Sequence, residues 1–179
     1  MHKTLTTLAI SAAAILLSGC AGMYGHGHGS GPSARAQLEP TRGNTTAGTV
    51  MFHTRANGVF VHARVSGLKP GQEHGFHIHE KGDCSSGDGM STGGHFNPTG
   101  KPHAHHATAD RHTGDLPSLK ADAQGNADLR IAVQGPTIGS GATDIIGKGL
   151  IVHAMPDDYK TQPTGNAGAR IACAVIQAR

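Results

Sequence analysis

The sequence predicts an all-β domain of about eight short strands with two long loops, and three observations favour this class. The chain has 179 residues, of which 15% are charged and 27 are Gly, a composition typical of a small domain with many tight turns. Apolar and polar residues alternate in several short segments, as they do in half-buried strands. No amphipathic helix of convincing length and no internal repeat interrupts this pattern.

The first residues have the pattern of a secretory signal. Lys3 supplies the positive start, and the apolar run from Leu5 to Leu17 is too short to span a membrane comfortably. The ending LSGC at residues 17–20 resembles the lipobox of bacterial lipoproteins, which implies cleavage before Cys20 and a lipid on that cysteine. An ordinary signal peptidase site is the alternative. We therefore expect residues 1–19 to be a lipoprotein signal peptide.

Residues 20–33 are rich in Gly and His and lack apolar periodicity, so we expect a flexible tether. His26 and His28 in this segment are either polar linker residues or a weak metal-capture arm. Several acyl chains on Cys20 would anchor the chain stably. Because Ala21 rather than Asp follows the cysteine, analogy with lipoproteins indicates the outer membrane. The expected location is the periplasm or cell envelope, with the chain lipid-anchored at the outer membrane.

The charge of the chain argues against nucleic acid as a partner. The formal net charge is +3, and without Lys3 it falls to +2, from 14 basic and 12 acidic residues. No run of basic residues occurs, whereas nucleic-acid-binding domains show one. A small anionic substrate stays compatible, because the local field matters more than the net charge.

From about residue 34 the alternation becomes regular, and we expect one domain over residues 34–179. The predicted strands are 50–54, 59–65, 76–80, 119–123, 127–133, 150–154 and 170–177, with 119–123 and 127–133 forming a hairpin. The long loops are 81–115 and 155–169, and each directly follows a strand that carries His. Loops of this length in a compact domain are usually functional, so a site is expected there.

The 14 His residues, in a chain with little charge, indicate metal. His77 and His79 in GFHIHE point to the same face of a strand and can bind one metal ion. His153 in LIVHAM is a further candidate, although a lone His on a strand is more often a hydrogen-bonded core residue. With His95 of the GGHFNP segment these residues would give four imidazoles. Four imidazoles without a thiolate would suit copper that cycles between two oxidation states.

The first long loop offers a second set of ligands. Three imidazoles and one carboxylate make a reasonable tetrahedral zinc site, from His95, His103, His112 and Asp115. On spacing alone His105 and His106 compete as ligands.

The chain contains three cysteines. If Cys20 is acylated, Cys84 and Cys173 remain, and an oxidising envelope allows them to pair. Closing such a loop contributes roughly 4–5 kcal/mol in the chain-entropy model. The alternative is two free buried thiols.

Five segments in order, GFHIHE, GGHFNP, RHTGDL, VHAMPDD and TGNAGARIACAVI, resemble the Cu/Zn superoxide dismutase family from about Ala34 to Ile176. The resemblance implies an eight-stranded Greek-key β-sandwich or barrel with a metal-binding loop and an electrostatic loop. It also implies one copper and one zinc per chain. The copper ligands it implies are His77, His79, His95 and His153, and the zinc ligands are His95, His103, His112 and Asp115.

The same resemblance assigns roles around the metals. Cys84 and Cys173 match the family disulfide, and Asp157 matches a carboxylate that hydrogen-bonds a His from each metal site. Arg170 matches the Arg beside the copper. His74 matches a position that braces the loop beneath the site. Two residues are expected to be catalytic: His95, which takes up and returns a proton, and Arg170, which attracts the anion.

The implied activity is the conversion of two superoxide anions to oxygen and hydrogen peroxide by copper redox cycling, which protects the cell envelope. The alternative is a copper-buffering lipoprotein with the same fold and little turnover. Arg170 and Asp157 favour the enzyme, because a buffer needs neither. The second loop is short, so Lys160 is only a candidate steering residue. Dimer contacts differ between bacterial and eukaryotic members, and a homodimer is left open.

Overall fold

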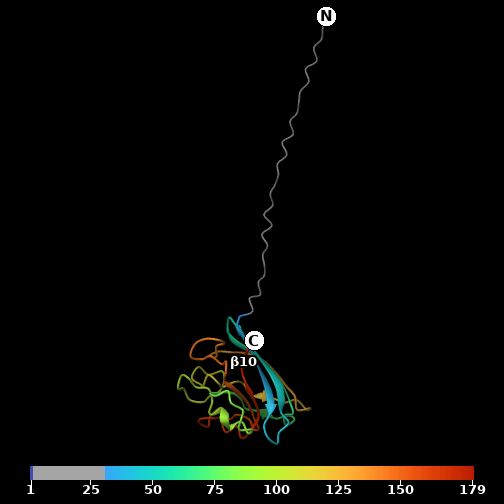
Figure 1. Cartoon of the computed structure of the whole chain (residues 1–179), viewed down its shortest axis with the longest axis vertical. Coiled ribbons are helices and arrows are strands. Elements are labelled where there is room, and N and C mark those ends of the chain that lie inside the picture. Colours follow the sequence, from blue (N-terminus) through green and yellow to red (C-terminus); the bar gives the residue numbers. More distant parts are fainter. Residues whose placement is uncertain (2–30) are drawn as a thin grey trace.

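The computed structural model describes Met1 and residues 31–179. The predicted signal peptide over residues 1–19, the lipidation site Cys20, and His26 and His28 of the tether lie outside the described residues. The folded domain in Figure 1 therefore consists of residues 31–179.

The described residues form β-strands and one short 3-10 helix, with no α-helix among them. The strands are β1 Ser33–Pro40, β2 Ala47–Arg55, β3 Gly58–Ser66, β4 Glu73–His74, β5 Phe76–His79, β6 Leu119–Lys120, β7 Ala127–Val133, β8 Gly149–His153, β9 Arg170–Val175 and β10 Gln177–Ala178, and the 3-10 helix η1 is Met90–Thr92. Eight strands make one antiparallel sheet in the order β5-β8-β9-β1-β2-β3-β7, with β10 also paired to β1. This sheet curls into a half-barrel (Figure 1), which confirms the predicted class.

The predicted alternation is visible in β2 and β3. Val50 and Phe52 of β2 are buried in the core, whereas Met51 and His53 between them point to the other face of the sheet. β3 follows the same rule, because β2 and β3 pair in register from Ala47↔Ser66 to Arg55↔Gly58. Successive side chains of a strand point to opposite faces, so the sequence pattern fixes which face is inside.

The order of the strands brings distant segments together. β5 pairs with β8, so that Phe76 lies opposite Val152 and His77 opposite Ile151. Phe76 and Val152 point into the core cluster, and His77 and His79 therefore point to the outer face of the sheet. This outer face, close to the long loops, is where the predicted metal ligands of these strands lie.

The two long loops are confirmed. No strand of the described chain lies between His79 at the end of β5 and Leu119, or between His153 and Arg170. The first loop returns to β5 at Gly114, whose carbonyl accepts a 2.9 Å hydrogen bond from the N–H of Ile78. A Cβ at residue 114 would overlap the carbonyl oxygen of Ile78, so only glycine permits this close approach.

The predicted hairpin between residues 119–123 and 127–133 is wrong as a sheet pairing. The chain does turn there, with the N–H of Asp122 bonded to the carbonyl of Asn126 at 2.7 Å. However, β6 pairs with β4, and β7 pairs with β3. The apolar pattern predicts that both segments are extended, but it does not say which neighbour each one pairs with.

Candidate metal centre

Four imidazoles gather on the outer face of the β5–β8 part of the sheet. β5 supplies His77 and His79, the first long loop supplies His95, and the end of β8 supplies His153. All four are buried, and one potential ligand atom from each lies within 4.8 Å of the others. We call this group the four-histidine cluster.

Each imidazole of this cluster has one nitrogen without a partner. The unpartnered buried atoms are His77 Nδ1, His79 Nε2, His95 Nε2 and His153 Nε2. Leaving a buried polar atom unsatisfied costs free energy, and four such atoms in one place are unusual in a folded protein. A metal ion that accepts all four lone pairs would remove this cost, so the cluster fits a metal with nitrogen ligands.

The opposite nitrogens of three of these rings are held by the protein. His79 Nδ1 lies 2.9 Å from the carbonyl of Gly93, and His153 Nδ1 lies 3.1 Å from the carbonyl of Gly168. His77 Nε2 lies 2.8 Å from Asp157 Oδ2. A carbonyl can only accept, so His79 and His153 donate from Nδ1 and direct a bare Nε2 toward the centre of the cluster.

The electrostatics of the cluster favour neutral imidazoles. Burial lowers the pKa of His95 to about 4, against the hydrogen bond to Asp115 that raises it. Burial also lowers the pKa of His77, and it lowers the pKa of His79 and His153 well below the usual value. Neutral imidazoles keep the lone pairs that a metal requires.

A second group lies beside the first and shares His95. Around Asp115 Oδ1, His95 Nδ1 is at 2.9 Å, His103 Nδ1 at 3.0 Å and His112 Nδ1 at 3.5 Å. All four residues are buried, and we call this group the aspartate cluster. Three imidazoles and one carboxylate are a suitable tetrahedral set for zinc.

Asp115 itself is held firmly in place. Its Oδ2 accepts hydrogen bonds from the backbone N–H groups of His112 at 3.0 Å and Ala104 at 3.2 Å. Burial raises the pKa of this carboxyl, but the hydrogen bonds to His103, His112 and His95 outweigh it and hold the pKa far below its usual range. Asp115 is therefore ionised and available as a ligand.

Asp157 joins the two clusters. Its Oδ2 lies 2.8 Å from His77 Nε2, and its Oδ1 lies 2.9 Å from His103 Nε2. Although burial opposes ionisation, the hydrogen bonds to His103 and His77 lower the pKa of Asp157 well below its usual value. The carboxylate thus orients one imidazole of each cluster.

The environment of Asp157 depends on two residues of the second loop that the sequence did not single out. A Cβ at Gly165, where φ is +67°, would overlap Asp157 Oδ1 and His103 Nε2. Gln162 clasps the backbone of His103, with its Oε1 2.8 Å from the His103 N–H and its Nε2 2.8 Å from the His103 carbonyl. No motif marks either residue, because their role arises only from contact between the two loops.

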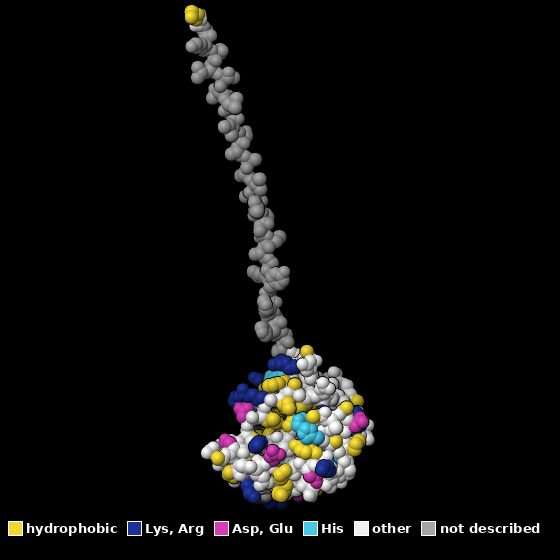
Figure 2. Space-filling view, turned by 180° about the vertical axis from the view of Figure 1, so that it is seen from behind, with side chains coloured by type: hydrophobic (Ala, Val, Ile, Leu, Met, Phe, Trp, Pro, Cys, Tyr) yellow, Lys and Arg dark blue, Asp and Glu magenta, His cyan; other side chains and the backbone are white. Residues whose placement is uncertain are grey.

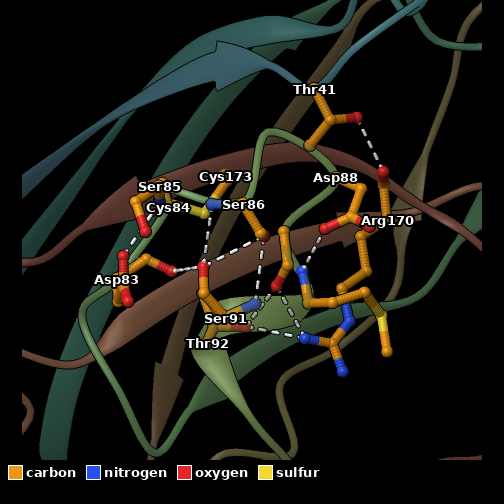
Figure 3. The surroundings of a disulfide bond; sticks show 12 residues. Thr41, Asp83, Cys84, Ser85, Ser86, Asp88, Ser91, Thr92, Arg170 and Cys173 are labelled. Atoms are coloured by element: carbon orange, nitrogen blue, oxygen red, sulfur yellow. Dashed lines mark hydrogen bonds between the residues drawn. A yellow bond between two sulfur atoms is a disulfide. The ribbon is translucent and has the colours of Figure 1, made fainter.

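Arg170 lies at the start of β9 and is fixed by the first loop. Its Nη1 donates to the carbonyl of Gly89 at 2.7 Å and to Thr92 Oγ1 at 2.8 Å (Figure 3). Its Nη2 donates to the carbonyl of Gly93 at 2.8 Å. The Gly93 carbonyl also receives the Nδ1–H of His79. The guanidinium charge helps to lower the pKa of both His79 and His153, which places it next to the four-histidine cluster.

The predicted disulfide between Cys84 and Cys173 is confirmed, with Cα atoms 6.0 Å apart. It joins β9 to the segment of the first loop that carries the acceptors for Arg170, as Figure 3 shows. Ser91 Oγ adds a hydrogen bond of 2.6 Å to the carbonyl of Asp83 within that segment. The disulfide therefore holds the loop and the arginine in one fixed arrangement.

The structure brings the seven predicted ligands and Asp157 into one connected centre, and the roles of the seven as metal ligands stay predictions. His74 lies beside it, with Nδ1 2.8 Å from the carbonyl of His153. His105 and His106 are not part of either cluster, and they stack on each other with ring centroids 4.0 Å apart. Spacing alone left His103, His105 and His106 as competing candidates for the aspartate cluster, and in the fold only His103 belongs to it.

Comparisons with known proteins agree with this geometry. The family model for copper/zinc superoxide dismutase (SODC) matches residues 46–176. Cu-Zn superoxide dismutase 2 of Aquifex aeolicus is 38% identical over 148 residues, which are 80% of this chain and 86% of that protein. The Cu-Zn superoxide dismutase of Deinococcus radiodurans is 37% identical over 195 residues, covering 99% of both.

Two solved structures share the fold. The clock protein EA4 matches with a TM-score of 0.75 and 38% identity, over 85% of this chain and 98% of that chain. A SOD-like protein from Bacillus subtilis matches with a TM-score of 0.71 and 35% identity, over 79% of this chain and 96% of that chain.

We predict that Asp115→Ala loses zinc before copper. The variant removes the carboxylate of the aspartate cluster but none of the atoms of the four-histidine cluster. Loss even of an outer partner of a metal ligand costs about 10–100-fold in affinity, so loss of a ligand should cost more. Metal analysis of the loaded variant after dialysis against a weak chelator checks this, with Asp110→Ala, an exposed carboxylate of the same loop, as control. Full zinc occupancy in Asp115→Ala would contradict the assignment.

Proposed function

The chain belongs to the copper/zinc superoxide dismutase family, and we propose that its four-histidine cluster holds the catalytic copper and its aspartate cluster holds zinc. The chain is a superoxide dismutase, which converts two superoxide anions to oxygen and hydrogen peroxide. The observation that carries the assignment of the metals is the pair of buried clusters sharing His95, each with the donor set that its metal prefers.

The donor atoms distinguish the two metals. Copper bound by the four unpartnered nitrogens supplies the one-electron oxidation and reduction that the reaction needs. The rings that hold it sit on paired strands or on a loop fixed to them, so the nitrogens stay in place through a cycle. The aspartate cluster offers a carboxylate and three Nδ1 atoms, and zinc there would keep His95 positioned through its Nδ1.

Protons are consumed in the reaction, and His95 Nε2 is the atom that we assign to hold one. This nitrogen is buried and has no hydrogen-bond partner, whereas Nδ1 of the same ring is directed to Asp115 Oδ1. Because one lone pair cannot bind a proton and a metal ion at once, His95 Nε2 would release copper when it holds the proton, and the fixed Nδ1 would keep the ring in position. Asp157 supports this arrangement by orienting His77 on one side and His103 on the other.

Arg170 provides the cation for the anionic substrate. Its guanidinium is half-buried, and its three hydrogen bonds to the first loop fix it beside His79. Burial lowers its pKa somewhat, but the group stays charged at neutral pH. A fixed positive charge at the site stabilises bound anion and raises the rate of encounter.

A copper buffer with the same fold is the alternative function. One relative is named only as similar to a superoxide dismutase. A Bacillus subtilis protein named superoxide dismutase-like protein YojM is 39% identical over 123 residues. In the present chain, all four imidazoles of the copper cluster are in place, and so are Asp157 and Arg170. A buffer needs neither of the last two residues in these positions, so their geometry favours the enzyme.

For localisation, we propose that the mature chain is anchored in the outer membrane by a lipid on Cys20 and faces the periplasm. The lipobox-like sequence at residues 17–20 and the intramolecular disulfide support this, because disulfides persist in an oxidising envelope. Among the residues that the structure describes, no helix is long and apolar enough to cross a membrane.

A homodimer stays a prediction. Within residues 31–179 the large hydrophobic side chains with high exposure are Met90, at 60%, and Met155, at 51%. The interfaces of obligate dimers are more apolar than a surface with two exposed methionines. A contact between two copies would therefore be mainly polar.

We predict that the metal-loaded chain dismutates superoxide rapidly and that His77→Ala abolishes this activity. His77 supplies one of the four unpartnered nitrogens, and its ring is oriented by the hydrogen bond to Asp157. Pulse radiolysis of the chain from Ala21 onward, with His106→Ala as a control outside both clusters, measures the rates. Tight copper binding without turnover in the unmodified chain would establish the buffer instead.

Replacing the cation tests the role of Arg170. In Arg170→Ala both metals should stay bound, because no metal ligand is removed. The rate constant at low ionic strength should fall by about tenfold or more, in line with the effect of steering charges. Arg170→Lys should recover part of the loss. Dismutation rates over a range of salt check this, and an unchanged rate at low salt would show that Arg170 has no part in attracting the anion.

The anchor is tested by Cys20→Ser. Without the thiol no lipid can be attached, so the chain should move from the membrane fraction to the soluble periplasmic fraction of cells that express it. Immunoblots of fractionated cells, with Cys84→Ser as a control that leaves Cys20 intact, measure the distribution. Retention of Cys20→Ser in the membrane fraction would argue against a lipid anchor.

A further inference from the structure

The outer face of the β1–β2–β3–β7 part of the sheet carries an unusual set of side chains. Five exposed arginines lie on it, and we call this surface the arginine face: Arg35, Arg55, Arg64, Arg130 and Arg179. The register places them together. Arg35 lies opposite Met51, Met51 opposite His62, and His62 opposite Arg130, and residues directly opposite share a face.

The charge of the domain is concentrated here. The arginine face has two acidic residues, Glu39 and Asp128, against its five cations, and hence a formal charge of +3 with His neutral. The other residues of the domain contain 9 Lys and Arg and 10 Asp and Glu, so the rest of the molecule is slightly acidic. A domain of net charge +2 thus has one strongly basic side.

Asp128 does not neutralise the whole face. It pairs with Arg130, at 3.0 Å from Nε, and with Arg64, at 3.7 Å from Nε. All ion pairs of the face within residues 31–179 involve Asp128. None of them involves Arg35, Arg55 or Arg179.

The pKa of His53 reflects the positive field at the end of the face where β1 begins. The residue lies across from Phe60 in the register of β2 and β3. Burial and then the charges of Arg55, Arg179 and His62 lower its pKa. Two arginines with no acidic partner, Arg55 and Arg179, therefore lie close to a ring whose protonation they oppose.

The basic side chains are interleaved with apolar ones. Phe60 and Met51 are half-buried on the same face, between His53, His62 and the arginines. Arginine with aromatic and thioether side chains is the composition of surfaces that lie at a membrane interface. Arginine also binds phosphate groups through two parallel hydrogen bonds, which the lysines elsewhere on the domain do not.

The chain enters the domain at the edge of this face. β1 begins at Ser33, the N–H of Thr54 in β2 donates to the carbonyl of Pro32 at 3.0 Å, and the N–H of Arg179 donates to the carbonyl of Ser33 at 3.0 Å. Figure 2 shows dark-blue Lys and Arg side chains gathered close to the point where the described chain begins. The chain therefore enters the domain on the side of the molecule where these cations lie.

We propose that the arginine face is a docking surface for the anionic phospholipid headgroups of the membrane to which the chain is anchored. The inference rests on the proposed anchor for its setting, but the face itself would bind without the lipid. Docking also orients the molecule. His77 and His79 lie on the outer face of β5, at the opposite end of the strand order from β7, and Figure 1 shows the long loops on the side of the barrel away from β2 and β3. The metal centre would thus open away from the bilayer.

The test uses the metal-loaded chain from Ala21 onward, which has no Cys20 and cannot be acylated. It is sedimented with vesicles of phosphatidylglycerol and phosphatidylcholine in equal parts, and with vesicles of phosphatidylcholine alone. We expect binding to the anionic vesicles only, and weaker binding as salt is raised. Arg35→Gln, Arg55→Gln and Arg179→Gln combined should weaken partitioning about a hundredfold, since each cation near an anionic surface contributes about fivefold.

The matched control removes the same charge elsewhere, by combining Lys69→Gln, Lys81→Gln and Lys120→Gln. It should weaken binding far less than the arginine variant. Equal losses in the two variants, equal binding to neutral vesicles, or tighter binding to duplex DNA than to anionic vesicles at the same phosphate concentration would each overturn the proposal. Dismutation by the arginine variant in solution should stay at the level of the unmodified chain, so failure of docking is distinguishable from failure of the enzyme assignment.

Discussion

Four buried imidazole nitrogens without hydrogen-bond partners are the constraint on which the rest of this structure depends. A fold that hides these atoms from water needs a metal to satisfy them. Their opposite nitrogens must be anchored to carbonyls or carboxylates so that the lone pairs converge. Asp157, Asp115 and the carbonyls of Gly93 and Gly168 perform this anchoring, and each comes from a loop rather than a strand.

The loops are in turn fixed by the sheet. Gly114 rests directly on β5, the disulfide ties the first loop to β9, and Gln162 of the second loop clasps the backbone of His103 in the first. These contacts hold Arg170 beside His79 as well as the ligands themselves. The metal centre and its cation are therefore one unit, in which the strands supply rigidity and the loops supply the chemical groups.

Two parts of the outer face of the curled sheet differ in what they carry. The outer face of β5 and β8 carries the metal ligands under the loops, whereas the outer face of β1, β2, β3 and β7 is open and basic. Alternation along a strand lets each segment serve the shared core with one side and a distinct outer surface with the other. Stability and the two outer surfaces can thus be specified by different residues of the same strands.

The sequence by itself determined the fold class, the two long loops, the Cys84–Cys173 pair and the residues of both clusters, because alternation, cysteine number and the order of five motifs are local or countable properties. The tertiary structure alone decided that Leu119–Lys120 pair with β4, since an apolar pattern does not name a partner. It places His103, and neither His105 nor His106, in the aspartate cluster, as the family resemblance implied, and it alone revealed Gln162 and Gly165. It also brought five arginines, scattered from residue 35 to 179, onto one face, because only strand pairing makes distant residues neighbours.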